Sequence, residues 1–101
     1  MPESMRILHI EPTVFFVSDE EALRQQVRVT VSNSGAAVAA TMTVRSAGIN
    51  ESLMLERVES GETVHEIYLP DLRSPAELIF ALHVADRMQD QRSVGWTPQK
   101  H

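Results

Sequence analysis

The fold of this chain is indicated first by the stretch Val27-Arg28-Val29-Thr30-Val31-Ser32-Asn33-Ser34-Gly35. Valines alternate with polar residues, which places the three valines on one face of an extended strand and the polar residues on the other. Valine and threonine are branched at Cβ and favour pleated, half-buried positions. Asn33 to Gly35 then predicts a turn, because Asn and Gly both tolerate positive φ. The stretch therefore predicts a strand with one buried face, followed by a turn.

Alternation of the same kind recurs on both sides of this stretch. Each further run is short and is bounded by turn residues such as Gly, Pro, Asn and Asp. Together with residues 23–32, strands are predicted at residues 5–10, 13–17, 38–44, 53–58, 63–69, 77–84 and 91–96. Pro12 interrupts the ladder after the first run, which is typical of an edge strand. Short strands at a spacing of about ten residues predict an all-β fold, an immunoglobulin-like antiparallel β-sandwich of seven or eight strands.

The predicted core consists of apolar residues that share one face of the central strands. These are Val27, Val29, Val31, Val38, Met42, Val44, Leu78, Phe80, Leu82 and Val84. A chain of 101 residues has the size of one domain. We assign residues 1–96 to the sandwich and residues 97–101, which are polar and include Pro98, to a tail or linker to a following domain. Ser18 to Glu21 has the pattern of a helix capping box, so a single helical turn is an alternative there.

Charge and composition exclude several classes of function. The net charge is −5, with 9 Lys and Arg residues scattered among 14 Asp and Glu residues. Nucleic-acid binding draws on clustered basic residues, so we expect no nucleic-acid partner. No apolar stretch reaches the roughly 18 residues of a transmembrane helix, so we expect no membrane span. The chain has no cysteine, which excludes a disulfide and a thiolate nucleophile.

Residues that could support catalysis or bind a metal are scattered along the chain. The histidines are His9, His65, His83 and His101, and none has the spacing of a metal-binding pair with another. Asp86 and Asp90 lie in a predicted turn, where Arg87 and Arg92 would oppose a calcium ion. There is no Gly-x-Ser-x-Gly elbow and no Gly-rich phosphate loop. We therefore predict no catalytic residue, no metal site and no cofactor, and we expect that the chain is not an enzyme.

Aromatic residues are the remaining candidates for a binding surface, because flat rings stack on the faces of sugars. Phe80 falls on the predicted core face. Either Phe15 or Phe16 must point inward, since neighbours on a strand face opposite sides. The other member of that pair, Tyr68 and Trp96 are the rings for which a surface position is open, although a core position is favoured for most of the aromatic residues.

Trp96 closes the last predicted strand, and two roles are open to it. It could fill the base of the sandwich, or it could pack against a domain that follows. Together with Tyr68 and Pro98, it makes up the set of residues that we predict to contact a neighbouring domain or a ligand.

Residues 27–35, an alternating strand followed by an Asn-x-Gly turn, resemble bacterial adhesion or accessory domains of the CARDB/NEW3 type. In those domains the next strand carries alternating small and apolar residues, as at residues 38–44. A Gly-Glu-Thr turn then precedes a strand, as at Gly61-Glu62-Thr63. The likeness runs from about Leu23 to Val84. It implies an immunoglobulin-like sandwich beside enzymatic or cell-surface domains, with no chemistry of its own.

A second likeness rests on Tyr68-Leu69-Pro70-Asp71 and on Val94-Gly95-Trp96-Thr97-Pro98. These segments are similar to the N-terminal module of some bacterial proteins whose next domain resembles family 38 glycoside hydrolases, the α-mannosidases. The likeness implies a catalytic domain that opens with a His-x-Asp metal signature beyond His101. No catalytic residue is therefore carried over to this chain.

The residues and the likenesses together predict a non-catalytic accessory module. It would pack against or orient a neighbouring domain of the same polypeptide, such as a glycoside hydrolase domain. The alternative is an adhesion-type module that binds carbohydrate or, at an exposed sheet edge, protein. A sugar site would be expected to change the tryptophan fluorescence on titration with glycans.

Overall fold

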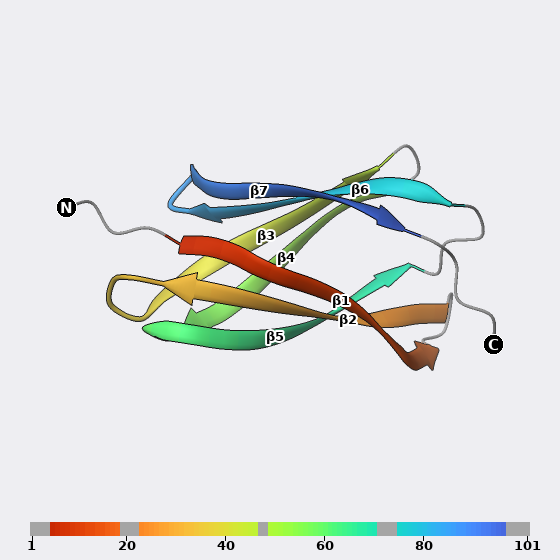
Figure 1. Ribbon diagram of the computed structural model, residues 1–101, viewed down its shortest axis with the longest axis horizontal. Helices are drawn as coiled ribbons and strands as arrows, with labels where there is room; N and C mark the ends of the chain where they lie inside the picture. The colour runs from red at the N-terminus through yellow and green to blue at the C-terminus, as the bar shows by residue number, and fades with distance from the viewer. Residues whose placement is uncertain (1–4, 19–22, 47–48, 71–74, 97–101) are drawn as a thin grey trace.

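The computed structural model describes residues 5–18, 23–46, 49–70 and 75–96, which form strands and turns (Figure 1). The strands are β1 (Met5–Ser18), β2 (Leu23–Asn33), β3 (Val38–Ser46), β4 (Ile49–Val58), β5 (Gly61–Pro70), β6 (Ala76–Val84) and β7 (Arg87–Trp96). None of the described residues belongs to a helix that could cross a lipid bilayer. Most of the predicted capping box and the predicted tail, residues 97–101, lie outside the described residues.

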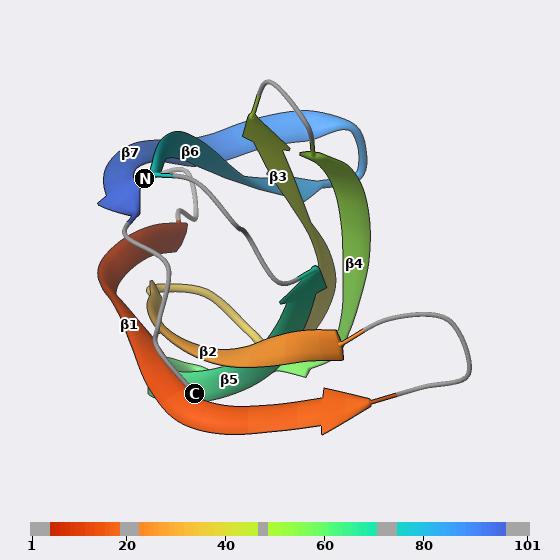
Figure 2. The same cartoon turned by 90° about the vertical axis from the view of Figure 1, so that its right-hand side faces the viewer.

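The strands form two antiparallel sheets that pack face to face (Figures 1 and 2). One sheet has the strand order β1-β2-β5, and the other has the order β4-β3-β6-β7. In a constant-type immunoglobulin domain the fourth strand joins the sheet of the first two strands, whereas β4 here pairs with β3. The predicted immunoglobulin-like antiparallel sandwich is confirmed, with seven strands.

The core lies between the two sheets and is built from alternate residues of the central strands. The valines of the opening stretch, residues 27–35, are fully buried, and so are Met42, Val44 and Phe80. Burial stabilises a side chain of this size by about 1.5–3 kcal/mol relative to an exposed one. The predicted core is therefore confirmed in its centre, and Val84 packs against it while partly exposed.

Val38 is the predicted core residue that the structure places elsewhere, because its side chain is 37% exposed. It opens β3 at the end of the sheet. A register shift between Val38 and Ala40 adds one residue to the facing stretch of β4, between Leu55 and Val58. Val58 is fully buried and fills that end of the core instead.

The predicted turn at Asn33 is present, but the reason given for it was wrong. Neither Asn33 nor Gly35 has a positive φ. Asn33 Oδ1 accepts a hydrogen bond from the backbone N–H of Gly35 at 2.9 Å, and the Asn33 amide donates to the carbonyls of Ala36 and Val58. Because Val58 ends β4, this buried side chain links the end of one sheet to the other.

The hairpin between β6 and β7 turns at Ala85 and Asp86, whose φ values are 49° and 65°. Two consecutive positive φ angles are typical of a two-residue hairpin turn. The turn predicted at residues 86–90 was therefore too long, since β7 already begins at Arg87. A tight turn fixes the pairing of the residues beside it, so the polar residues that follow continue the strand.

β1 is an edge strand of the three-stranded sheet, as Pro12 predicted. It continues across Pro12 as one strand, with register shifts against β2 between Ile7 and His9 and between Pro12 and Phe16. Bulges of this kind bend an edge strand and increase its twist. They carry β1 around the side of the sandwich toward β7 (Figure 2).

Candidate functional site

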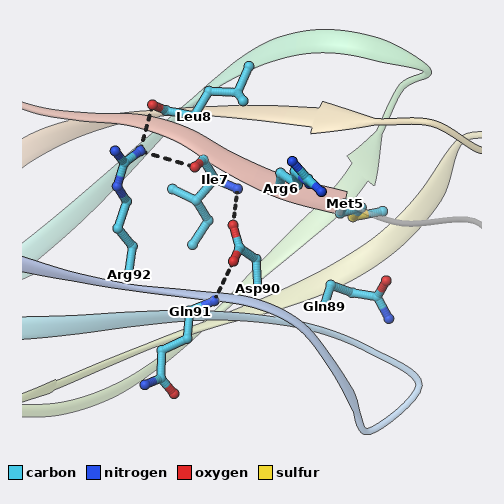
Figure 3. A pocket seen from close by; sticks show the side chains of 8 residues that line it. All are labelled: Met5, Arg6, Ile7, Leu8, Gln89, Asp90, Gln91 and Arg92. Atoms are coloured by element: carbon cyan, nitrogen blue, oxygen red, sulfur yellow. Dashed lines mark hydrogen bonds between the residues drawn. The ribbon is translucent and has the colours of Figure 1, made fainter.

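Along one side of the sandwich, the edge of β1 lies beside the edge of β7 (Figure 3). Residues 5–8 of β1 and residues 89–92 of β7 line an open hollow of about 620 Å³. The two strands belong to different sheets, so no backbone ladder joins them. Side chains make the connection.

Asp90 and Arg92 span the hollow from β7 to β1. Asp90 Oδ2 accepts a hydrogen bond from the backbone N–H of Ile7 at 2.8 Å, and its Oδ1 accepts one from the N–H of Gln91 at 2.9 Å. The Arg92 guanidinium donates to the carbonyl oxygens of Ile7 at 3.1 Å and Leu8 at 2.6 Å. These two side chains, the edge clasp, thus give β1 the donor and the acceptor that a neighbouring strand would give.

The position of the edge clasp follows from the alternation of β7. Asp90 pairs with Leu82, and Arg92 pairs with Phe80. Both partners are core residues, so the edge clasp lies on the core side of β7, in phase with Trp96. Sequence reasoning missed it by assigning Asp90 to a turn. The sequence did contain a signal for the edge clasp, because Asp90 and Arg92 alternate in phase with the apolar Trp96 at the end of the same strand.

The edge clasp is suited to joining strands. Both carboxylate oxygens of Asp90 accept backbone amides, and the Arg92 guanidinium donates to backbone carbonyls. Hydrogen bonds to a charged group stabilise a fold by about 1.5–3 kcal/mol each. The charged groups of the edge clasp therefore hold the two sheets together.

Trp96 lies in the core, with only 5% of its surface exposed. It ends β7 opposite Ala76. The structure thus favours the reading in which Trp96 fills the base of the sandwich. Because it is the only tryptophan and is buried, a sugar bound on an exposed sheet face would leave its fluorescence largely unchanged.

Tyr68 lies on the outer face of the three-stranded sheet and is 37% exposed. It pairs with Gln26, which is only 7% exposed. The Gln26 amide donates to the hydroxyl oxygen of Tyr68 at 3.2 Å and to the carboxylate of Glu66. From the other side, Thr13 Oγ1 donates to the side-chain oxygen of Gln26 at 3.3 Å and to its backbone carbonyl at 3.0 Å. A nearly buried amide is therefore held between β1 and β5.

Phe15 lies on the bulge of β1 and is 59% exposed. Its backbone N–H donates to Thr13 Oγ1 at 3.1 Å, so hydrogen bonds through the side chains of Thr13 and Gln26 connect the Phe15 backbone to the Tyr68 hydroxyl. Phe16 is partly buried and pairs with the buried Gln25, so the expected division of the Phe pair is confirmed. We name Phe15, Gln26 and Tyr68 the aromatic patch.

The remaining candidate site residues do not form a cluster. Pro98 and His101 lie outside the described residues. His9 is on β1, 3.9 Å from the carboxylate of Glu11, and His83 is on β6, 3.4 Å from Thr43 Oγ1. Within the described ranges, no three His, Cys, Asp or Glu side chains are grouped so that they could hold a metal ion.

His65 is the histidine with a perturbed environment. It pairs with the core residue Val29, which places its ring on the inner face of β5, and its Nε2 lies 2.8 Å from Thr63 Oγ1. Burial lowers the pKa of His65 from its ordinary value of 6.5, because desolvation disfavours the charged ring.

This lowered pKa predicts a pH-dependent stability. Between the lowered pKa and 6.5 the unfolded chain binds a proton at His65 that the folded chain does not, so stability rises with pH there. We expect the free energy of unfolding to fall as the pH drops through 6.5 toward the lowered pKa, and His65→Gln to reduce that fall. Urea unfolding at several pH values checks this, with His9→Gln as the exposed control. An unchanged pH profile in His65→Gln would contradict it.

No protein-family model matches this chain, and no curated protein matches it. The resemblances to CARDB/NEW3-type domains and to the modules that precede family 38 glycoside hydrolases therefore stay predictions.

Proposed function

We propose that this chain is a non-catalytic accessory module that packs against a neighbouring domain of the same polypeptide and orients it. The observation that carries the proposal is the burial of Trp96 at the end of β7. A strand that ends on a core residue has a fixed position and direction at its last residue. A segment joined to it would start from a defined point, and a domain held there would be oriented by the sandwich.

The hydrogen bonding of the polar side chains supports a packing role. Among the described residues, every buried side-chain nitrogen and oxygen has a hydrogen-bond partner. The edge clasp, a pair of polar side chains that crosses between the two sheets, binds backbone groups of β1. A catalytic site needs free polar groups that converge on one point, whereas these groups hold strands together.

The two resemblances suggest the kind of neighbour. They imply a sandwich beside an enzymatic or cell-surface domain, and the second implies a glycoside hydrolase domain of family 38 type beyond His101. The edge clasp and the buried Trp96 would then keep the module rigid while its outer faces contact that domain.

The test begins with the reading frame past the codon for His101. If the frame continues, the chain is produced alone and joined to the domain that follows, and rotational correlation times are measured by ¹⁵N relaxation. We expect both parts to tumble as one body. Independent tumbling, or a stop codon directly after His101, would count against the proposal.

The aromatic patch favours a second candidate function, carbohydrate binding. Phe15 and Tyr68 are exposed, and the Gln26 amide donates hydrogen bonds to the Tyr68 hydroxyl and to the Glu66 carboxylate. Exposed rings supply flat apolar surfaces for sugar faces, and an amide beside them supplies directed hydrogen bonds. A neutral oligosaccharide fits this combination of groups.

Titration with neutral oligosaccharides, followed by NMR shifts of β1, β2 and β5 amides, tests this candidate. We expect Tyr68→Ala and Phe15→Ala each to weaken binding by about threefold to tenfold, the effect of one lost aromatic contact. Val64→Ala is the control, because Val64 is equally exposed on β5 at 59% but is not part of the aromatic patch. No shift across a broad panel would remove carbohydrate binding.

A further inference from the structure

Among the described residues, four strands lie at sheet edges, β1 and β5 in one sheet and β4 and β7 in the other. An edge strand offers unpaired backbone groups to any other strand, and natural sheets usually block this with proline, bulges, charges or a covering segment. The four edges differ in how far they are blocked.

Three of the edges are blocked. β1 contains Pro12 and two register shifts, and the edge clasp occupies part of its backbone. β7 carries that edge clasp and lies beside β1. β5 presents Glu62 and Glu66 and ends at Pro70.

β4 is open at its centre, because its charged residues Glu51, Glu56 and Arg57 flank that centre and its register shift against β3 lies beyond Leu55. It has no proline, and from Ile49 to Leu55 it pairs with β3 without a register shift. The run Ser52-Leu53-Met54-Leu55 at its centre is uncharged. In the part of the chain that the structure describes, β3 is the only strand that pairs with β4, which forms the outer side of its sheet (Figure 2).

Apolar exposure is concentrated at the same place. Met54 is 70% exposed, the highest value among the exposed large hydrophobic residues described, and it lies at the centre of β4. Leu53, on the opposite face, is only partly buried against the core. A strand paired with β4 would cover both side chains.

We propose that the edge of β4 is a self-association surface, where β4 of a second copy adds antiparallel about a two-fold axis at Met54. This inference is independent of whether a domain follows the chain. Such pairing would place Met54 against Met54 of the second copy, and Leu53 against Leu55 of the second copy. The two four-stranded sheets would then form one continuous sheet of eight strands.

Charge complementarity supports a second copy as the occupant. In this register Ser52 faces Glu56 and Glu51 faces Arg57 of the second copy, so unlike charges are opposed at both ends of the run. The charges at the ends of the run already have partners within the chain. Glu51 Oε1 lies 3.3 Å from the Arg24 guanidinium, and Arg57 binds Glu59.

The contact is small, so the association should be weak. A stable protein interface buries at least about 1,200 Å² of surface. A single pair of strands buries less than this, so we expect a transient dimer. Sedimentation equilibrium from about 10 μM to 1 mM therefore covers the range in which such dimers form. We expect the mean mass to rise from 11.3 kDa toward twice that value.

Met54→Lys is the decisive variant, because two lysines would meet at the two-fold axis with Cβ atoms about 5 Å apart. We expect it to weaken dimerisation at least about tenfold, which corresponds to 1.4 kcal/mol. Met88→Lys is the matched control, since Met88 is 56% exposed on β7 of the same sheet. We expect the Met88→Lys variant to dimerise like the wild type. Circular dichroism is used to check that both variants are folded.

Three results would overturn the proposal. They are a constant mass of 11.3 kDa over the whole range, growth beyond the dimer, and a Met54→Lys variant that dimerises as tightly as the wild type. Hydrogen exchange gives a second measurement, in which the β4 amides should become more protected as the concentration rises while the β5 amides do not.

Discussion

Replacing Trp96 with alanine is expected to lower the free energy of unfolding by about 3–5 kcal/mol, the usual cost of truncating a buried aromatic residue. Trp96 is 5% exposed and belongs to the core between the sheets, so its removal leaves a cavity. A small domain is stable by only about 5–15 kcal/mol, and this loss is a large part of it.

Urea unfolding followed by far-UV circular dichroism measures the effect, since the variant has no tryptophan to report by fluorescence. Trp96→Phe keeps a ring in the core and should lose clearly less stability. Met88→Ala, at an exposed position on the same strand, should change the stability by no more than about 0.5 kcal/mol. If Trp96→Ala cost less than about 1 kcal/mol, the side chain would not have the core role assigned to it.

Replacing Asp90 with alanine is expected to cost about 1.5–3 kcal/mol. The change removes the acceptor of the Ile7 backbone N–H, at 2.8 Å, across the gap between the two sheets. Water can enter the open hollow and solvate that N–H, which keeps the loss within this range. Asp90→Asn retains one acceptor oxygen and should lose less.

Chemical unfolding gives the stability change, and amide exchange at Ile7 gives a local readout that a general loss of stability does not share. Gln89→Ala is the matched control, because Gln89 lines the same hollow but its amide donates to the Arg87 carbonyl on its own strand. Equal stability of Asp90→Ala and Gln89→Ala, with unchanged exchange at Ile7, would contradict the role of the edge clasp.

Much of the fold was predictable because burial follows a period of two. The valines at residues 27–31 alternate with polar residues, and Leu78, Phe80 and Leu82 share one face of their strand, and all of these apolar residues are buried. Val38 alternates in the same way but is exposed, because alternation gives the face of a strand and not its distance from the end of the sheet. Bulges shift that distance, and they leave little trace in a single sequence.

The candidate site was less predictable, because it depends on which strands become edges. Tyr68 was one of the rings for which a surface position was open, and it is 37% exposed, but its connection to β1 requires β1 and β5 to flank β2. The edge clasp requires β1 and β7 to lie beside each other across the two sheets. Neither arrangement can be derived from local patterns, since both depend on strands that are far apart in the sequence.

The distance in sequence between β1 and the edge clasp also determines when the edge clasp can form during synthesis of the protein. Arg92 follows Ile7 by 85 residues, so the ribosome makes β1 long before the side chains that cover its edge. At about 5–20 residues per second, this interval is roughly 4–17 s. During that time β1 has an open edge, and only its Pro12 and its bulges protect it from pairing with another nascent chain. The proline and the bulges, which weaken the ladder of the finished sheet, are thus useful before the sheet is complete.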